Sequence, residues 1–166
     1  MGQAAGTRRG GTHMVAVRTQ DPRPSAQFTQ QDFASETNVE LRVFLVEDLQ
    51  RMRGLMKDLF ASMGGFQLVA TAGTEAEAKF WLDEHPGEWD LAIIDLVLEQ
   101  GAGMNIIRHC KEQPNGGRIV VFSSYASPGV RQHCLDLGAD AVFDKGETAQ
   151  FIAWFADYAS RENSGP

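Results

Sequence analysis

Residues 41–48 read LRVFLVED, and residues 91–96 read LAIIDL. Each stretch is a short, almost solid apolar run that is followed at once by acidic side chains: Glu47 and Asp48 in the first stretch and Asp95 in the second. Solid apolar runs of this length are typical of parallel strands that are covered on both faces. The two stretches therefore indicate buried strands of a parallel sheet with carboxylates at the strand ends.

Three further apolar runs follow the same pattern, at residues 66–71, 119–122 and 141–143. The segments between the five runs, and the segment after the last one, show helical spacing or helix caps, such as Thr74 and the pair Ser127-Pro128. Strict alternation of five strands and five helices predicts an α/β fold. We expect a flavodoxin-like, doubly wound parallel sheet with strand order 2-1-3-4-5 and helices on both faces.

The composition predicts one folded domain with short tails. The chain has 166 residues, of which 43% are hydrophobic. Residues 1–40 contain few large aliphatic side chains, so we expect a disordered tail there. A folded domain over residues 41–160 and a short tail over residues 161–166 complete the expected organisation. The two cysteines, Cys110 and Cys134, lack the spacing of a zinc site and are expected to be buried thiols.

Charge and hydropathy exclude several classes of partner. The formal net charge is -7, which disfavours binding to a nucleic-acid backbone. No apolar run approaches the length of a membrane span, and the N-terminus lacks the apolar stretch of a secretion signal. We therefore expect no nucleic-acid partner, no membrane insertion and a cytoplasmic location.

The polar residues at the strand ends define the candidate site. In open parallel sheets, ligands bind beyond the carboxyl ends of the strands, and strands one and three flank the switch point. Glu47, Asp48 and Asp95 should therefore share one pocket, where three carboxylates repel one another unless a cation lies among them. Mg²⁺ prefers such oxygen ligands. Lys145 would add a positive charge and Ser123 a hydroxyl donor, so the pocket could hold a phosphoryl group on one carboxylate.

From residue 41 to about residue 160, the sequence resembles the receiver domain of two-component response regulators. Several motifs, in order and at compatible spacing, carry the resemblance: VFLVED with Glu47 and Asp48, LAIIDL with Asp95, Gly103, VVFSS with Ser123, GAD at Gly138, and FDKG with Lys145. The resemblance implies that Asp95 is the phosphoacceptor. It also implies that Glu47, Asp48, Asp95 and the backbone carbonyl of Val97 hold Mg²⁺, or Mn²⁺ in its place, while Lys145 and Ser123 contact the transferred oxygens.

The same resemblance implies a set of partners. A sensor histidine kinase or a histidine phosphotransfer protein would donate the phosphoryl group, and an unknown target would bind the face formed by the fourth helix, the fifth strand and the fifth helix. Ser123 and residue 142 are the switch positions; this chain has Val142 where the family usually has Tyr or Phe. Because only one further helix follows Lys145, we expect a stand-alone receiver that catalyses its own phosphorylation and dephosphorylation and is not a conventional enzyme.

The sequence leaves three alternative functions open. A pseudo-receiver would serve as an interaction module without phosphorylation. A phosphatase of the haloacid dehalogenase type also uses a strand-end aspartate, but it needs a second aspartate where this chain has Val97. A flavodoxin-like FMN carrier would need a phosphate-binding loop after the first strand, where Glu47 and Asp48 would repel a phosphate.

Overall fold

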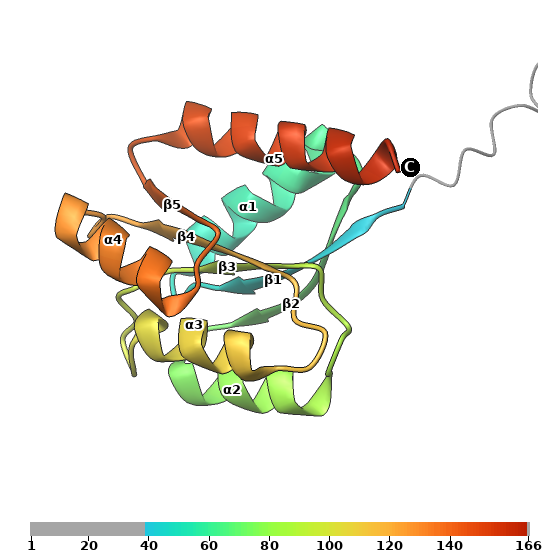
Figure 1. The fold of residues 1–166 in the computed structure, drawn as a ribbon. Coiled ribbons are helices and arrows are strands. Elements are labelled where there is room, and N and C mark those ends of the chain that lie inside the picture. The colour runs from blue at the N-terminus through green and yellow to red at the C-terminus, as the bar shows by residue number, and fades with distance from the viewer. Residues whose placement is uncertain (1–38, 166) are drawn as a thin grey trace, which may run out of the picture. The chain divides into compact units, whose positions relative to one another are not determined.

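The structure, a computed structural model, describes residues 39–165. Nearly all of the tail predicted over residues 1–40 therefore lies outside the described residues. In the described part, five strands alternate with five helices (Figure 1). The elements are β1 (Leu41–Val46), α1 (Gln50–Met63), β2 (Phe66–Ala72), α2 (Glu75–Glu84), β3 (Leu91–Ile94), α3 (Gly103–Glu112), β4 (Arg118–Ser123), α4 (Pro128–Leu137), β5 (Ala141–Asp144) and α5 (Thr148–Asn163).

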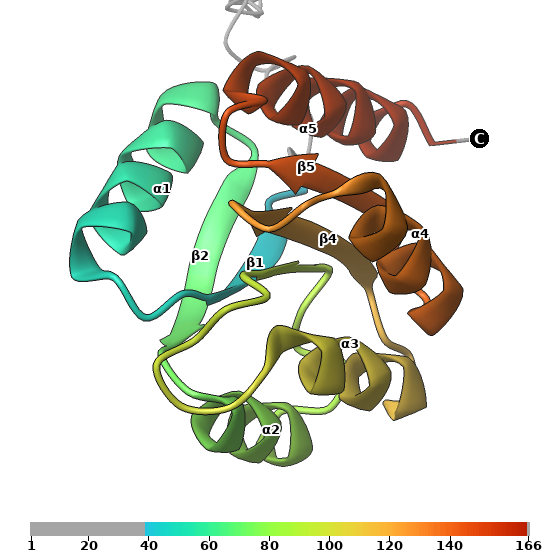
Figure 2. The same cartoon turned by 90° about the vertical axis from the view of Figure 1, so that its left-hand side faces the viewer.

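The five strands form one parallel sheet in the order β2-β1-β3-β4-β5. This confirms the predicted flavodoxin-like topology. The helices α1 and α5 cover one face of the sheet, and α2, α3 and α4 cover the other, as the two views in Figures 1 and 2 show. All carboxyl ends of the strands consequently meet at one edge of the sheet.

Alternate residues of the central strands supply two separate cores. On β1, Phe44 and Val46 pack toward α2, α3 and α4, whereas Val43 and Leu45 pack toward α1 and α5. The side-chain period of two in a strand explains this division. Because both faces are buried, the strands contain almost no polar residue until they end, as the solid apolar runs predict.

Two predicted helix caps, at Thr74 and Ser127, are present. The Thr74 side chain accepts a hydrogen bond from the Glu77 amide at 3.1 Å, and the Ser127 side chain accepts one from the Val130 amide at 3.4 Å, with Pro128 in the first turn. The helix α5 ends at Asn163, beyond the boundary predicted near residue 160. An Asp157–Arg161 ion pair, of the i, i+4 kind that supports helices, lies across that boundary.

Both cysteines are buried free thiols, as predicted. Burial raises the pKa of the Cys110 thiol to about 12 and also raises the pKa of Cys134. Within residues 39–165, no helix has the length and apolar character needed to span a bilayer.

Candidate functional site

The carboxyl edge of the sheet brings the predicted residues together from four strands. Glu47 and Asp48 follow β1 directly, Asp95 follows β3, and Ser123 is the last residue of β4. Lys145 follows β5, and its amide donates a hydrogen bond to the Ser123 carbonyl at 3.1 Å. Because the strands are parallel and in register, residues separated by many positions in the sequence meet at this edge.

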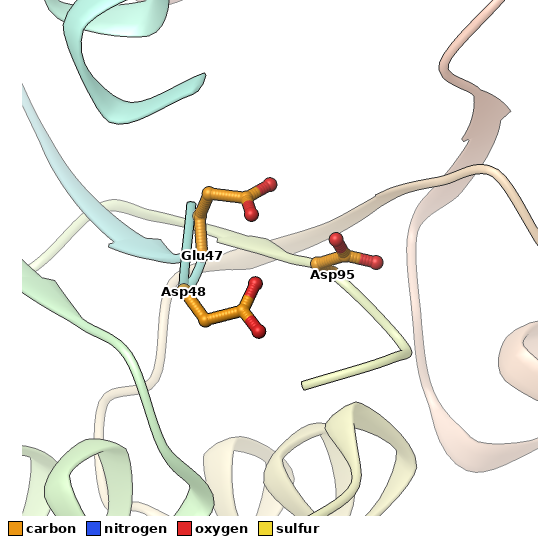
Figure 3. Close-up of side chains that lie close together, drawn as sticks. All are labelled: Glu47, Asp48 and Asp95. Atoms are coloured by element: carbon orange, nitrogen blue, oxygen red, sulfur yellow. The ribbon is translucent and has the colours of Figure 1, made fainter. Parts of the chain in front are cut away.

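Three carboxylates form a cluster at the centre of this edge. Glu47, Asp48 and Asp95 each offer one oxygen, and these oxygens lie within 4.8 Å of one another (Figure 3). Glu47 is only 2% exposed and Asp95 only 7% exposed, whereas Asp48 is partly exposed. Buried carboxylates at this separation repel each other strongly, so the cluster favours a cation or a proton.

Lys145 is the ammonium group that enters the cluster. Its Nζ atom donates to Glu47 Oε2 at 2.8 Å and to Asp95 Oδ2 at 2.7 Å. Burial acts to lower the pKa of Lys145, but its hydrogen bonds to Asp95 and Glu47 outweigh burial, so the pKa is raised. Burial also raises the pKa of Glu47, although the Lys145 ammonium acts in the opposite direction. The single lysine therefore does not neutralise the cluster.

Backbone amides hold the carboxylates in place. The Glu99 amide donates to Asp48 Oδ2 at 2.8 Å, and the Leu49 amide donates to Glu47 Oε1 at 3.0 Å. Partial burial opposes ionisation of Asp48, but the hydrogen bond from Glu99 helps to outweigh it and the pKa of Asp48 is lowered. Glu99 lies in the loop after Asp95, so this bond joins the loops that follow β1 and β3.

An open depression of about 260 Å³ leads to the carboxylates, and its lining includes Val97, Ser124 and Tyr125 as well as Asp48, Leu49, Asp95 and Lys145. Ser123, by contrast, is completely buried, and its Oγ accepts a hydrogen bond from the Tyr125 amide at 3.4 Å. Tyr125 is 63% exposed at the mouth of the depression. The structure thus brings Ser123 to the site but beneath its surface.

The predicted switch position, residue 142, has an aliphatic side chain on the α4 side of the sheet. Val142 packs against the core that contains α2, α3 and α4. Phe143 belongs to the opposite core, where it contacts Phe151 and Trp154 edge to face. Because neighbouring strand residues point to opposite faces, Phe143 does not take the place of an aromatic residue at position 142.

Two supporting residues were missed by the sequence analysis. The Arg53 guanidinium donates to the Glu47 carbonyl. Glu75 Oε2 accepts hydrogen bonds from the Ala102 amide and from Asn105, which fixes the loop after β3. Its hydrogen bond with Lys79, together with these two, lowers the pKa of Glu75 to about 2. The available signal for Glu75 was an acidic residue directly after the helix cap, which by itself indicates only a favourable helix start.

The site has the donors that a hard divalent cation requires. Three carboxylate oxygens within 4.8 Å, one open approach and an incomplete balance of charge match the preference of Mg²⁺ for carboxylate oxygens with water in the remaining positions. Lys145 lies beside this position, where it contacts Glu47 and Asp95 and lines the same depression. The residues present therefore fit a bound Mg²⁺.

The comparisons with known proteins agree with this description. The family model for the response regulator receiver domain matches residues 43–153. A gliding motility regulatory protein of Myxococcus xanthus is 34% identical over 109 residues, which are 64% of this chain and 14% of that protein. A protein-glutamate methylesterase/protein-glutamine glutaminase of Desulfotalea psychrophila is 28% identical over 102 residues. The chain spans 14% to 34% of the length of the curated relatives that it matches.

Solved structures share the fold. The response regulator domain of Thermotoga maritima CheB has a TM-score of 0.63 and 19% identity, covering 76% of this chain and 98% of that one. The CheX-CheY-BeF3-Mg complex from Borrelia burgdorferi has a TM-score of 0.62 and 21% identity, covering 72% of this chain and 92% of that one. The family model covers more than half of the sequence, and the sheet order and helix arrangement agree with it. The chain therefore belongs to the response regulator receiver family of two-component systems.

Proposed function

We propose that this chain accepts a phosphoryl group on Asp95 from a phosphohistidine and signals through protein–protein contacts. A sensor histidine kinase or a histidine phosphotransfer protein would be the donor. Glu47, Asp48, Asp95 and the carbonyl of Val97 would hold Mg²⁺, or Mn²⁺ in its place. The chain would catalyse its own phosphorylation and dephosphorylation and would not act as a conventional enzyme.

One observation carries this proposal. The Lys145 Nζ atom contacts Asp95 Oδ2 directly, beside two further carboxylates and at the base of an open depression. Phosphoryl transfer is catalysed mainly by positioning and by cations that neutralise charge on the phosphoryl oxygens. Lys145 supplies one such charge from the protein, and the carboxylate cluster provides a place for the other.

The transfer is an in-line displacement at phosphorus. An oxygen of Asp95 forms the new O–P bond while the P–N bond of the phosphohistidine breaks, and the electron pair of that bond remains on the imidazole nitrogen, which then takes up a proton. Lys145 would then contact an oxygen of the transferred group. A bound Mg²⁺ supplies further charge neutralisation on the phosphoryl oxygens. The backbone bonds to Asp48 and Glu47 keep their carboxylates oriented toward the cation position.

The proposal is tested by intact mass spectrometry with a small-molecule phosphodonor. The chain is incubated with Mg²⁺ and acetyl phosphate or phosphoramidate, with and without EDTA. We expect one labile phosphoryl adduct that depends on Mg²⁺ and is lost in Asp95→Asn, since the near-isosteric amide is not a nucleophile. Asp140→Asn, at the opposite edge of the sheet, is the matched control and should keep the adduct. An adduct that persists in Asp95→Asn would contradict the assignment.

A second candidate function is a pseudo-receiver that binds a partner without phosphorylation. The observation that favours it is Val142, because the family's usual aromatic switch residue is absent. The two functions differ in the same experiment: a pseudo-receiver forms no adduct and does not respond to Mg²⁺. In either case, the face formed by α4, β5 and α5 is the proposed contact surface for a downstream protein, and no nucleic-acid partner is proposed.

A further inference from the structure

Arg131 joins three segments that surround the proposed phosphoacceptor site. It lies in the first half of α4 and is partly buried. Its Nε atom donates to the Ala126 carbonyl at 2.8 Å, and its Nη1 atom donates to the Val142 carbonyl at 3.0 Å. Its Nη2 atom donates to Glu147 Oε2 at 2.7 Å. One guanidinium thus links the loop after β4, the strand β5 and the turn after β5.

Glu147 extends this link to the turn that carries Lys145. Its Oε2 atom also accepts a hydrogen bond from the Asp144 amide at 2.8 Å, and its own amide donates to the Asp144 carbonyl at 2.8 Å. Lys145 lies between these two residues and reaches Glu47 and Asp95. The ion pair with Arg131 therefore fixes the backbone from which the lysine enters the site.

A guanidinium is required for this arrangement. Its planar fork presents N–H groups in several fixed directions, whereas a lysine ammonium is a compact charge on a flexible chain. The three acceptors of Arg131 belong to three different segments and are contacted by three different nitrogen atoms. Arg131 therefore acts as a rigid connector, which a residue that only balanced the charge of Glu147 would not be.

Ser123 lies at the start of the connected loop. In the part of the chain that the structure describes, no hydrogen bond joins Ser123 to Asp95, and the Ser123 hydroxyl instead meets the Tyr125 amide. If this hydroxyl turns toward a phosphoryl group on Asp95, it gives up its hydrogen bond from the Tyr125 amide, and the backbone of residues 124–126 is then released to shift. That backbone ends in the Ala126 carbonyl, which Arg131 holds.

We propose that Arg131 is the positioning residue that couples the phosphoacceptor site to the α4-β5-α5 face, in place of the aromatic residue that Val142 replaces. The inference rests on the proposed phosphorylation of Asp95 and names the route by which it would be transmitted. Movement of the loop after Ser123 is passed through the guanidinium to the Val142 carbonyl and to Glu147. This coupling does not require an aromatic side chain at residue 142, because Arg131 contacts the backbone carbonyl of Val142.

Hydrogen exchange with mass spectrometry tests this coupling on the full chain. The probe is beryllofluoride with Mg²⁺, an analogue of a phosphoryl group on aspartate. In the unmodified protein, we expect the probe to change exchange in peptides covering residues 124–127 and residues 138–144. The second segment contains the Val142 carbonyl and the Asp144 amide and ends before Lys145, which contacts the site directly. In Arg131→Gln, the change at residues 124–127 should remain and the change at residues 138–144 should be lost. Arg131→Lys should behave like Arg131→Gln, because an ammonium does not serve three acceptors.

Arg118→Gln is the matched control, since it removes an arginine from an ion pair at the other edge of the sheet and should leave both responses intact. If Arg131→Gln proves unstable, Glu147→Ala removes one of the three connections and should also lose the response at residues 138–144. A variant at Arg131 that keeps this response while it binds the probe would overturn the inference. Failure of the unmodified protein to bind the probe, read separately by fluorine NMR, would refute the proposed function and the inference with it.

Discussion

The two edges of the sheet contain similar numbers of charged side chains but arrange them in opposite ways. At the amino edge, Arg42 pairs with Asp90 and Arg118 pairs with Asp140, so each acid has its own base. At the carboxyl edge, three carboxylates lie beside one lysine, and Lys145 contacts only two of them, Glu47 and Asp95. The hollow at the amino edge, about 600 Å³, is larger than the depression of about 260 Å³ at the carboxyl edge. Neither the size of a cavity nor the number of charges therefore distinguishes the edge with the candidate site; the excess of carboxylates does.

The acids at the amino edge also satisfy the backbone. Asp90 accepts a hydrogen bond from the Arg42 amide, and Asp140 accepts one from the Ile119 amide. These bonds anchor the beginnings of β1 and β4, so both pairs have a structural role. At the carboxyl edge, backbone amides orient the acids but the charge remains unbalanced. The predictions that follow compare matched changes at the two edges.

The largest difference between the edges is expected in the free energy of unfolding when one basic side chain is removed from each. Lys145→Ala leaves Glu47 and Asp95 buried without a counter-charge, which should reduce the free energy of unfolding by about 3 kcal/mol in EDTA. Arg118→Gln breaks an exposed pair and should cost no more than about 1 kcal/mol. Urea unfolding measures both values. Added Mg²⁺ should recover stability in Lys145→Ala and leave the effect of Arg118→Gln unchanged; equal losses in the two variants would contradict the comparison.

A second pair of changes concerns two glycines that approach backbone atoms closely. A Cβ atom at Gly103 would lie 2.1 Å from the Asp95 carbonyl oxygen, and one at Gly117 would lie 2.2 Å from the Asp90 carbonyl oxygen. Either Gly→Ala change should cost roughly 1–3 kcal/mol through overpacking. Only Gly103→Ala displaces the backbone of Asp95, so only this variant should weaken Mg²⁺ binding. Calorimetric titration with Mg²⁺ distinguishes the two variants. Equal Mg²⁺ affinities would show that Gly103 does not help to position Asp95.

The sequence predicted the fold and the site for the same physical reason. Solid apolar runs indicate strands buried on both faces, and in a parallel sheet the residues that end such runs must converge at one edge. Glu47, Asp95 and Lys145 could therefore be placed together before their distances were known. Ser123 was also placed correctly at this edge, although its complete burial was not predicted, because burial depends on the path of the loop that follows it.

The connections among the loops could not be predicted. The hydrogen bond from the Glu99 amide to Asp48 and the three hydrogen bonds of Arg131 depend on loop conformations. The spacing of apolar residues predicts helices and strands but not the conformations of loops. In the sequence, Arg131 resembles any polar residue on the outer side of a helix. Only the position of Ala126, Val142 and Glu147 around it shows that it connects separate segments.

The smallest expected effect concerns how stability depends on pH. The contributions of Glu47 and Asp90, one at each edge, should change with pH in opposite directions. Burial raises the pKa of Glu47 above its ordinary value of 4.5, so the folded chain holds this proton more readily than the unfolded chain does. The contribution of Glu47 to stability therefore falls as the pH rises from that ordinary value to the raised one. The bond from Arg42 lowers the pKa of Asp90 below 3.8, so the stability from Asp90 is present above that value and is lost as the pH falls toward the lowered one.

Melting temperatures of Glu47→Gln and Asp90→Asn, each compared with the unmodified protein in EDTA from about pH 3 to about pH 7, measure this difference. The Glu47→Gln difference should become more positive as the pH rises, because the substitution removes a group whose ionised form is disfavoured. The Asp90→Asn difference should become more negative, because the ionised form is the one that Arg42 stabilises. Mg²⁺ should remove the first slope, since a cation among the carboxylates favours ionised Glu47, and should not alter the second. Slopes of the same sign would mean that Glu47 is adequately neutralised by Lys145 and that the carboxyl edge lacks the excess charge on which the proposed cation site depends.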